Sequence, residues 1–167
     1  MFRAKRRSSC GQSLIELAAG ALVAVPILLG LLDCGVILIG VGANDLACRD
    51  AARAAASGPP GLLLAGTRTV SGAGAPLVRA KQVLNRIYHL GIPVKLRDDL
   101  LSVRERIWAP VPSVPDGGSI NGSVDISSTI DIYPPFIVGL VTHGSISMHS
   151  RHSFPYTYIV PTTASGF

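Results

Sequence analysis

Residues 10–35 read CGQSLIELAAGALVAVPILLGLLDCG, and this stretch decides the fold because it opens an apolar run long enough to cross a bilayer. From Leu17 to Ala43 the chain has 27 residues and a single charge, Asp33. As a helix this run would reach about 40 Å, against about 30 Å for the hydrocarbon core of a membrane. A secretory signal has only about 7–15 apolar residues. The run therefore predicts a membrane-spanning helix.

One acid sets the cost of this span and a basic cluster sets its orientation. Asp33 lies near its middle, where an acid costs about 2.5–3.5 kcal/mol. The many Leu, Ile and Val residues return about 0.3–0.6 kcal/mol each, so insertion is still favoured. A basic cluster precedes the span, at Arg3, Lys5, Arg6 and Arg7. By the positive-inside rule, the N-terminus is expected in the cytoplasm and the C-terminal region in a periplasm-like space.

The overall charge and the cysteines exclude other roles. The net charge is +5, but without residues 1–11 the chain has eleven basic and ten acidic residues, a net charge of +1. No basic stripe with interleaved aromatic residues follows, so no nucleic-acid partner is expected. Cys10 precedes the span and Cys34 lies inside it. Only Cys48 could face an oxidising compartment, so no intrachain disulfide framework is expected.

Beyond the span the sequence predicts a small α+β domain. The alanine-rich stretch 44–57 should continue the helix outside the membrane until GPPG ends it. Residues 58–76 are rich in Gly and Pro, as in a linker. An amphipathic pattern then predicts one helix packed on an antiparallel sheet. The helix is expected over 77–90, strands over 103–109, 124–132, 145–151 and 156–160, and a turn over 116–122.

The junction before the span has a pattern of its own. Residues 6–11 read RRSSCG, and Glu16 is the fifth residue after Gly11. This junction resembles the class III leader of type IV prepilins, in which a membrane aspartyl peptidase cuts after the Gly on the cytoplasmic side. The resemblance implies cleavage between Gly11 and Gln12.

The stretch GQSLIELA (11–18), joined to the alanine-rich exit helix, resembles the TadE-like family of minor pseudopilins in the tight-adherence, or Flp, pilus system. The likeness covers residues 6–58. It implies a part in assembly or priming of such a pilus or of a related secretion apparatus. The implied partners are the prepilin peptidase, other pilins or pseudopilins, the inner-membrane assembly platform and membrane lipid. Whether the protein enters the fibre or stays in the membrane is left open.

The resemblance gives a division of the chain and a location. Residues 1–11 would be a cleavable basic leader, 12–57 the transmembrane and juxtamembrane helix, 58–76 a linker and 77–167 a periplasmic α+β domain. The protein would cross the bacterial inner membrane once, with its N-terminus in the cytoplasm.

Glu16 has a physical role in this hypothesis. An ionised carboxylate in lipid is costly unless it is paired. Cleavage would create a free α-amine at Gln12, one helical turn away. This amine, or that of a neighbouring chain, would neutralise Glu16 and fix the axial register between packed helices. Asp33 is the second candidate, for contact with a partner inside the membrane.

The region after the span has no recognisable catalytic motif. It lacks a Gly-x-Ser-x-Gly elbow and a phosphate-binding loop. His149 and His152 would point to opposite faces of a strand, which does not suit a metal pair. No catalytic residue, metal ion or cofactor is predicted, and the chain is not expected to be an enzyme. The alternative is a single-pass periplasmic enzyme or binding protein with an ordinary signal anchor, uncut or cut near residues 54–56.

Overall fold

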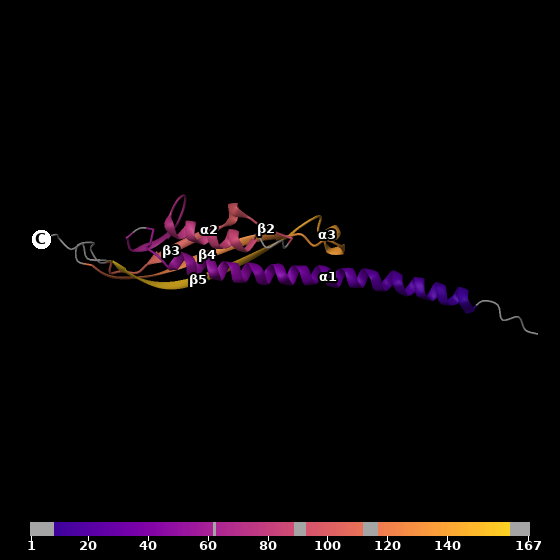
Figure 1. The fold of residues 1–167 in the computed structure, drawn as a ribbon. Coiled ribbons are helices and arrows are strands. Elements are labelled where there is room, and N and C mark those ends of the chain that lie inside the picture. Colours follow the sequence, from indigo (N-terminus) through magenta and orange to yellow (C-terminus); the bar gives the residue numbers. More distant parts are fainter. Residues whose placement is uncertain (1–8, 62, 89–92, 112–116, 161–167) are drawn as a thin grey trace, which may run out of the picture.

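A computed structural model describes residues 9–61, 63–88, 93–111 and 117–160. Within these residues the chain forms a long N-terminal helix, short helices and an antiparallel sheet, which confirms the α+β class. Figure 1 shows the sheet and the short helices lying along one half of the long helix, while its other half extends away from them. We call the sheet and the short helices the head.

Helix α1, Ser9–Ala56, has 48 residues and continues through Pro26 without interruption. Its second half packs on α2, β4, β5 and α3. Small residues allow the close approach: a Cβ atom on Gly40 would lie 2.7 Å from Cδ1 of Ile132. The buried side chains of this half are also short. They include Ala47, Cys48, Ala51, Ala52 and Ala55.

Helix α2, Ala75–Tyr88, lies beside the end of α1. Arg79 of α2 donates hydrogen bonds to the carbonyl oxygens of Ala54 and Ala55, at 3.1 and 2.7 Å. These carbonyls belong to the last turn of α1 and have no partner within that helix. Helix α2 therefore caps α1 from outside.

The segment 58–76, expected as a linker, contributes to the sheet. Strand β1, Gly66–Thr69, pairs with β3, Ser102–Ile107, in antiparallel register. The backbone N–H of Gly61 donates to the carboxylate of Glu105 on β3, at 3.1 and 3.2 Å to its two oxygens. These bonds hold the segment on the head.

Two 15-residue strands form the centre of the sheet. β4, Gly118–Ile132, pairs with β5, Ile146–Val160, over its whole length. The other edge of β4 pairs with β3 and with β2, Val94–Leu96. A short 3-10 helix, Asp98–Leu100, connects β2 to β3.

The sequence prediction differs from the structure in this hairpin. The turn expected at 116–122 is wrong from Gly118 onward, because β4 already pairs with β5 there. Pairing with β5, joined by β3 at Gly122, overrides the local preference of Gly, Ser and Asn for turns. The two strands expected at 145–151 and 156–160 are one strand that includes Pro155. Pro155 is tolerated because, among the described strands, β5 lies at an edge.

The two faces of the sheet differ in polarity. Val124, Ile126 and Ile130 of β4 are buried against the helices, as their alternation predicts. The intervening positions are partly exposed and polar on the opposite face, among them Asp125, Ser127 and Thr129. One face of the antiparallel sheet is therefore covered and the other is solvated.

A polar residue, Asn44 of α1, lies in this core. Its Oδ1 accepts hydrogen bonds from the hydroxyl groups of Tyr88 and Ser128, at 2.8 and 2.9 Å. Its Nδ2 donates to the carbonyl oxygen of Met148 at 3.5 Å. One side chain thus joins α1 to α2, β4 and β5.

We expect Asn44→Leu to lower the free energy of unfolding by about 2–4 kcal/mol, because the hydroxyl groups of Tyr88 and Ser128 would lose their acceptor. Thermal and urea unfolding of the full chain in detergent micelles measures this. The control is Gly42→Ala on the exposed side of the same helix, where a Cβ atom has nothing within 4 Å. It should leave stability unchanged or raise it by up to about 1 kcal/mol. Equal stability of Asn44→Leu and the native chain would contradict this role.

Candidate functional site

The predicted cleavage and assembly residues lie in the first turns of α1. Gly11 is within the helix, and a Cβ atom there would have nothing within 4 Å. Nε2 of Gln12 donates a hydrogen bond to Oε1 of Glu16 at 3.2 Å. Gln12 and Glu16 therefore share one side of the helix, one turn apart. Within the described residues, Glu16 has no ion-pair partner.

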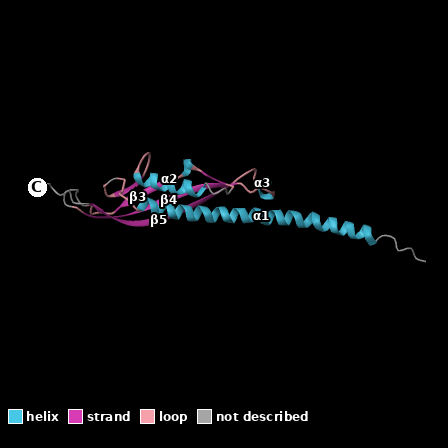
Figure 2. Ribbon diagram, in the orientation of Figure 1, coloured by secondary structure: helices cyan, strands magenta, loops and turns pink. Residues whose placement is uncertain are grey.

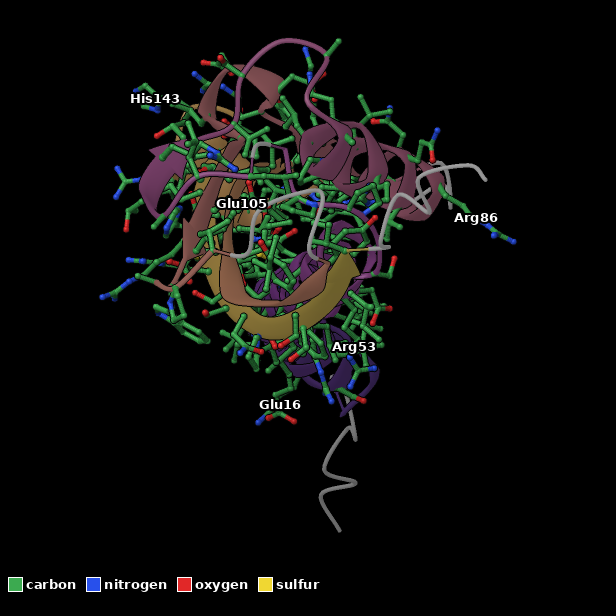
Figure 3. The ribbon with its side chains drawn as sticks, turned by 90° about the vertical axis from the view of Figure 1, so that its left-hand side faces the viewer. Glu16, Arg53, Arg86, Glu105 and His143 are labelled. Atoms are coloured by element: carbon green, nitrogen blue, oxygen red, sulfur yellow. The ribbon has the colours of Figure 1, made fainter. Side chains whose placement is uncertain are left out.

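The helix around these residues is apolar on all sides and lacks cover from the head. Every residue from 11 to 28 is exposed. Figure 2 shows this part of α1 extending beyond the described strands and other helices, and Figure 3 places Glu16 outside the head. The exposed large apolar side chains here are Leu14, Ile15, Leu17, Leu22, Val23, Val25, Ile27 and Leu28. A helix that is apolar all round requires lipid or other helices as its surroundings.

The length of this bare segment fits a bilayer. Gly11 to Leu32 is 22 residues, about 33 Å of helix, against about 30 Å for a hydrocarbon core. Helix α1 as a whole is long and apolar enough to cross a membrane. From residue 33 onward, α1 increasingly contacts the head. The sequence predicted a span over 17–43, whereas in the structure the part of α1 without a buried residue is 11–32. The two ranges differ because residues 33–43 include buried contacts with the head.

Asp33 marks the point where α1 reaches the head. Its side chain is 0% exposed. Its two carboxylate oxygens accept hydrogen bonds from the backbone N–H groups of Phe136 and Val138, at 3.0 and 2.7 Å. These groups lie at the start of the short helix α3, Ile137–Val141, between β4 and β5. The structure thus gives Asp33 bonding partners in its own chain, whereas the sequence suggested a partner elsewhere in the membrane.

Sequence reasoning missed the residues of the head that form hydrogen bonds with Asp33 of α1. Phe136 and Val138 bond Asp33 through their backbone, so their side-chain types carry no signal for this contact. The only available signal is the position of Asp33, 22 residues after Gly11, which is about one bilayer thickness along a helix. An acid at that distance is better placed at the end of a span than in its middle.

A second buried carboxylate, Glu105, is structural. Figure 3 shows it in the interior of the head. It accepts hydrogen bonds from Nη2 of Arg68 at 2.6 Å and from the hydroxyl group of Tyr156 at 3.0 Å. Burial and the adjacent negative charge of Glu105 raise the pKa of Tyr156 above its usual value, so this phenol stays protonated.

The histidines considered for metal binding have other contacts. Nε2 of His152 lies 2.7 Å from Oδ1 of Asp45, and Nδ1 of His149 lies 3.2 Å from Oγ1 of Thr129. The hydrogen bonds from His152 and Ser150 lower the pKa of Asp45 below its usual value. Among the described residues, no three His, Cys, Asp or Glu side chains gather as a metal-binding group.

We expect Asp33→Ala to lower the free energy of unfolding by about 3 kcal/mol, because two partly buried N–H groups lose a charged acceptor. Asp33→Asn should fall between this variant and the native chain, since the amide retains one acceptor oxygen. Limited proteolysis within 133–145 and thermal unfolding in micelles measure the effect.

The control is Asp98→Asn, which removes the same charge from an exposed side chain of the head. It should match the native chain in both measurements. Asp33 variants that match it as well would show that the bonds to Phe136 and Val138 contribute nothing.

The comparisons with known proteins add no relative. The sequence matches no protein-family model, and no curated protein or solved structure is detectably similar to it. The arrangement of the helix and the sheet does indicate a type of architecture. A long N-terminal apolar helix, half bare and half packed on an antiparallel sheet, is a pilin-like architecture.

Proposed function

We propose that this protein is a minor pseudopilin, processed after Gly11, that takes part in assembling or priming a tight-adherence pilus or a related secretion apparatus. Its action would be structural: α1 packs with the helices of other pilins or pseudopilins, and the head presents a periplasmic surface. The prepilin peptidase and the inner-membrane assembly platform are the further partners. The protein would reside in the bacterial inner membrane with its N-terminus in the cytoplasm.

One observation carries this proposal: a bare apolar helix of one bilayer thickness whose sole acid, Glu16, lies one turn from Gln12. The side chain of Gln12 already reaches Glu16 in the uncut chain. After cleavage, the same residue would also carry a positive α-amine. A carboxylate whose charge is neutralised by a partner can enter lipid or a helix bundle. An unpaired carboxylate is strongly disfavoured there.

Pairing of Glu16 with the new α-amine links cleavage to the position of the helix. Before cleavage, the basic residues of 1–11 hold this end of the helix at the membrane surface. Removal of residues 1–11 takes away four positive charges and supplies one amine at helix level. A charge pair between neighbouring helices tolerates little axial sliding, because each charge is costly once it is separated from its partner. Glu16 is therefore a register residue for helix packing.

In cells that contain a prepilin peptidase, the membrane-extracted product should begin at Gln12. Gly11→Val should give a heavier product that retains residues 1–11, as N-terminal sequencing and intact mass would show. Gly20→Val makes the same substitution at another exposed glycine of α1 and should be processed normally. A native product that begins at Met1, or near Ser57, would contradict the proposal and favour an ordinary signal anchor.

Glu16→Gln should leave cleavage intact but reduce the protein recovered with other pilins, by about tenfold or more, because removing one partner of a buried pair costs about 3–5 kcal/mol. The measurement is co-purification after crosslinking in cells, together with a count of surface pili. Asp98→Asn serves as the charge-matched control and should assemble normally. Normal assembly of Glu16→Gln would contradict the register role.

A further inference from the structure

The connection between β4 and β5 carries a largely apolar tip, in which His143 is the one basic side chain. Residues 133–145 read YPPFIVGLVTHGS and contain no Asp, Glu, Lys or Arg. The side chains of Leu140 and Val141 on α3 are 81% and 73% exposed. Tyr133 and Phe136 are also exposed. We call residues 133–145 the tip.

The tip lies at the level where the bare helix ends. Figure 1 shows α3 at the end of the head that is nearer the start of α1. The bonds from Phe136 and Val138 to Asp33 fix this position. Exposed apolar side chains therefore occur both on residues 11–32 and on the tip, which lies close to the end of the bare helix.

Several backbone groups of the tip have hydrogen-bond partners within the chain. Asp33 accepts two of its N–H groups. The N–H and the hydroxyl group of Thr142 both donate to the carbonyl oxygen of Val138, at 2.9 and 2.8 Å, and the N–H of Gly144 donates to Gly139 at 3.0 Å. Unpaired backbone groups are what usually keeps a turn out of a bilayer. At these positions, the backbone groups of the tip have hydrogen-bond partners within the protein and do not need water.

The middle of the tip packs closely on its first residues. A Cβ atom on Gly139 would collide with the carbonyl oxygen of Pro134, five residues earlier. Leu140 and Val141 follow this contact and are exposed, and the aromatic residues Tyr133 and Phe136 precede it. Aromatic side chains favour the boundary between headgroups and acyl chains.

We propose that the tip is a second membrane contact, which inserts Leu140 and Val141 into the outer leaflet while α1 spans the bilayer. This inference rests on the membrane anchoring proposed above. We assign lipid as the surrounding of the tip, because Leu140 and Val141 are exposed, the tip has no Asp, Glu, Lys or Arg, and α3 lies where the bare helix ends. Two contacts, one from α1 and one from the tip, would fix the tilt and rotation of the head on the membrane, which a single helix leaves free.

Tryptophan reporters in the full chain test this proposal, in a Trp108→Phe background so that the reporter is the sole indole. Leu140→Trp reports the tip. Leu22→Trp reports the bare helix. Ile159→Trp reports an equally exposed position, 74%, at the other end of β5. Each variant is reconstituted in phosphatidylcholine vesicles with or without lipids brominated on the acyl chains, and fluorescence quenching is measured.

We expect brominated lipid to quench at least about half of the emission from Leu22→Trp and from Leu140→Trp, and little of that from Ile159→Trp, since an interfacial contact buries side chains about 5–10 Å deep. Adding Asp33→Asn to Leu140→Trp should reduce its quenching without affecting the Leu22 reporter.

The other outcomes separate the two proposals. Quenching at Leu22 without quenching at Leu140 would overturn the tip contact while the membrane anchor stands. A blue shift at Leu140 without quenching would mean that protein covers the tip, which also overturns it. No quenching at Leu22 would overturn the anchoring, and the tip inference with it.

Discussion

The packing of residues 33–56 of α1 against the sheet is the constraint on which the rest of the structure depends. The apolar face of β4 needs a cover, and α1 and α2 provide it together. Alanine and glycine on α1 bring its backbone close to the sheet, as the tight approach of Gly40 to Ile132 shows. Without this half of α1, the apolar face of the two long strands would be open to water.

This arrangement makes α1 and the head one body. The helix is part of the core from Asp33 to its end, and Arg79 caps its last turn. The sheet therefore packs directly on the helix that also carries the bare segment.

Polar side chains in the core join particular elements to one another, since each forms hydrogen bonds with a defined partner. Asp33 holds α3, Asn44 holds α2 and both long strands, and Glu105 holds the segment before β1. Within the described residues, no buried side-chain nitrogen or oxygen lacks a hydrogen-bond partner. Because an unsatisfied buried group costs about 1–3 kcal/mol, these hydrogen bonds select one arrangement of helix and sheet over sliding alternatives.

The sequence by itself determined the long apolar helix, the α+β class and the inward-facing residues of β4, because each follows from composition or from a short-range period. It also placed Gln12 and Glu16 one turn apart, which needs only helix geometry. Tertiary structure alone decided where the bare segment ends, since that depends on which residues of α1 meet the head. It likewise decided the partners of Asp33, about a hundred residues away along the chain, and the extension of β4 through a Gly-rich stretch by pairing with β5. Contacts between residues so far apart in the sequence leave no local pattern.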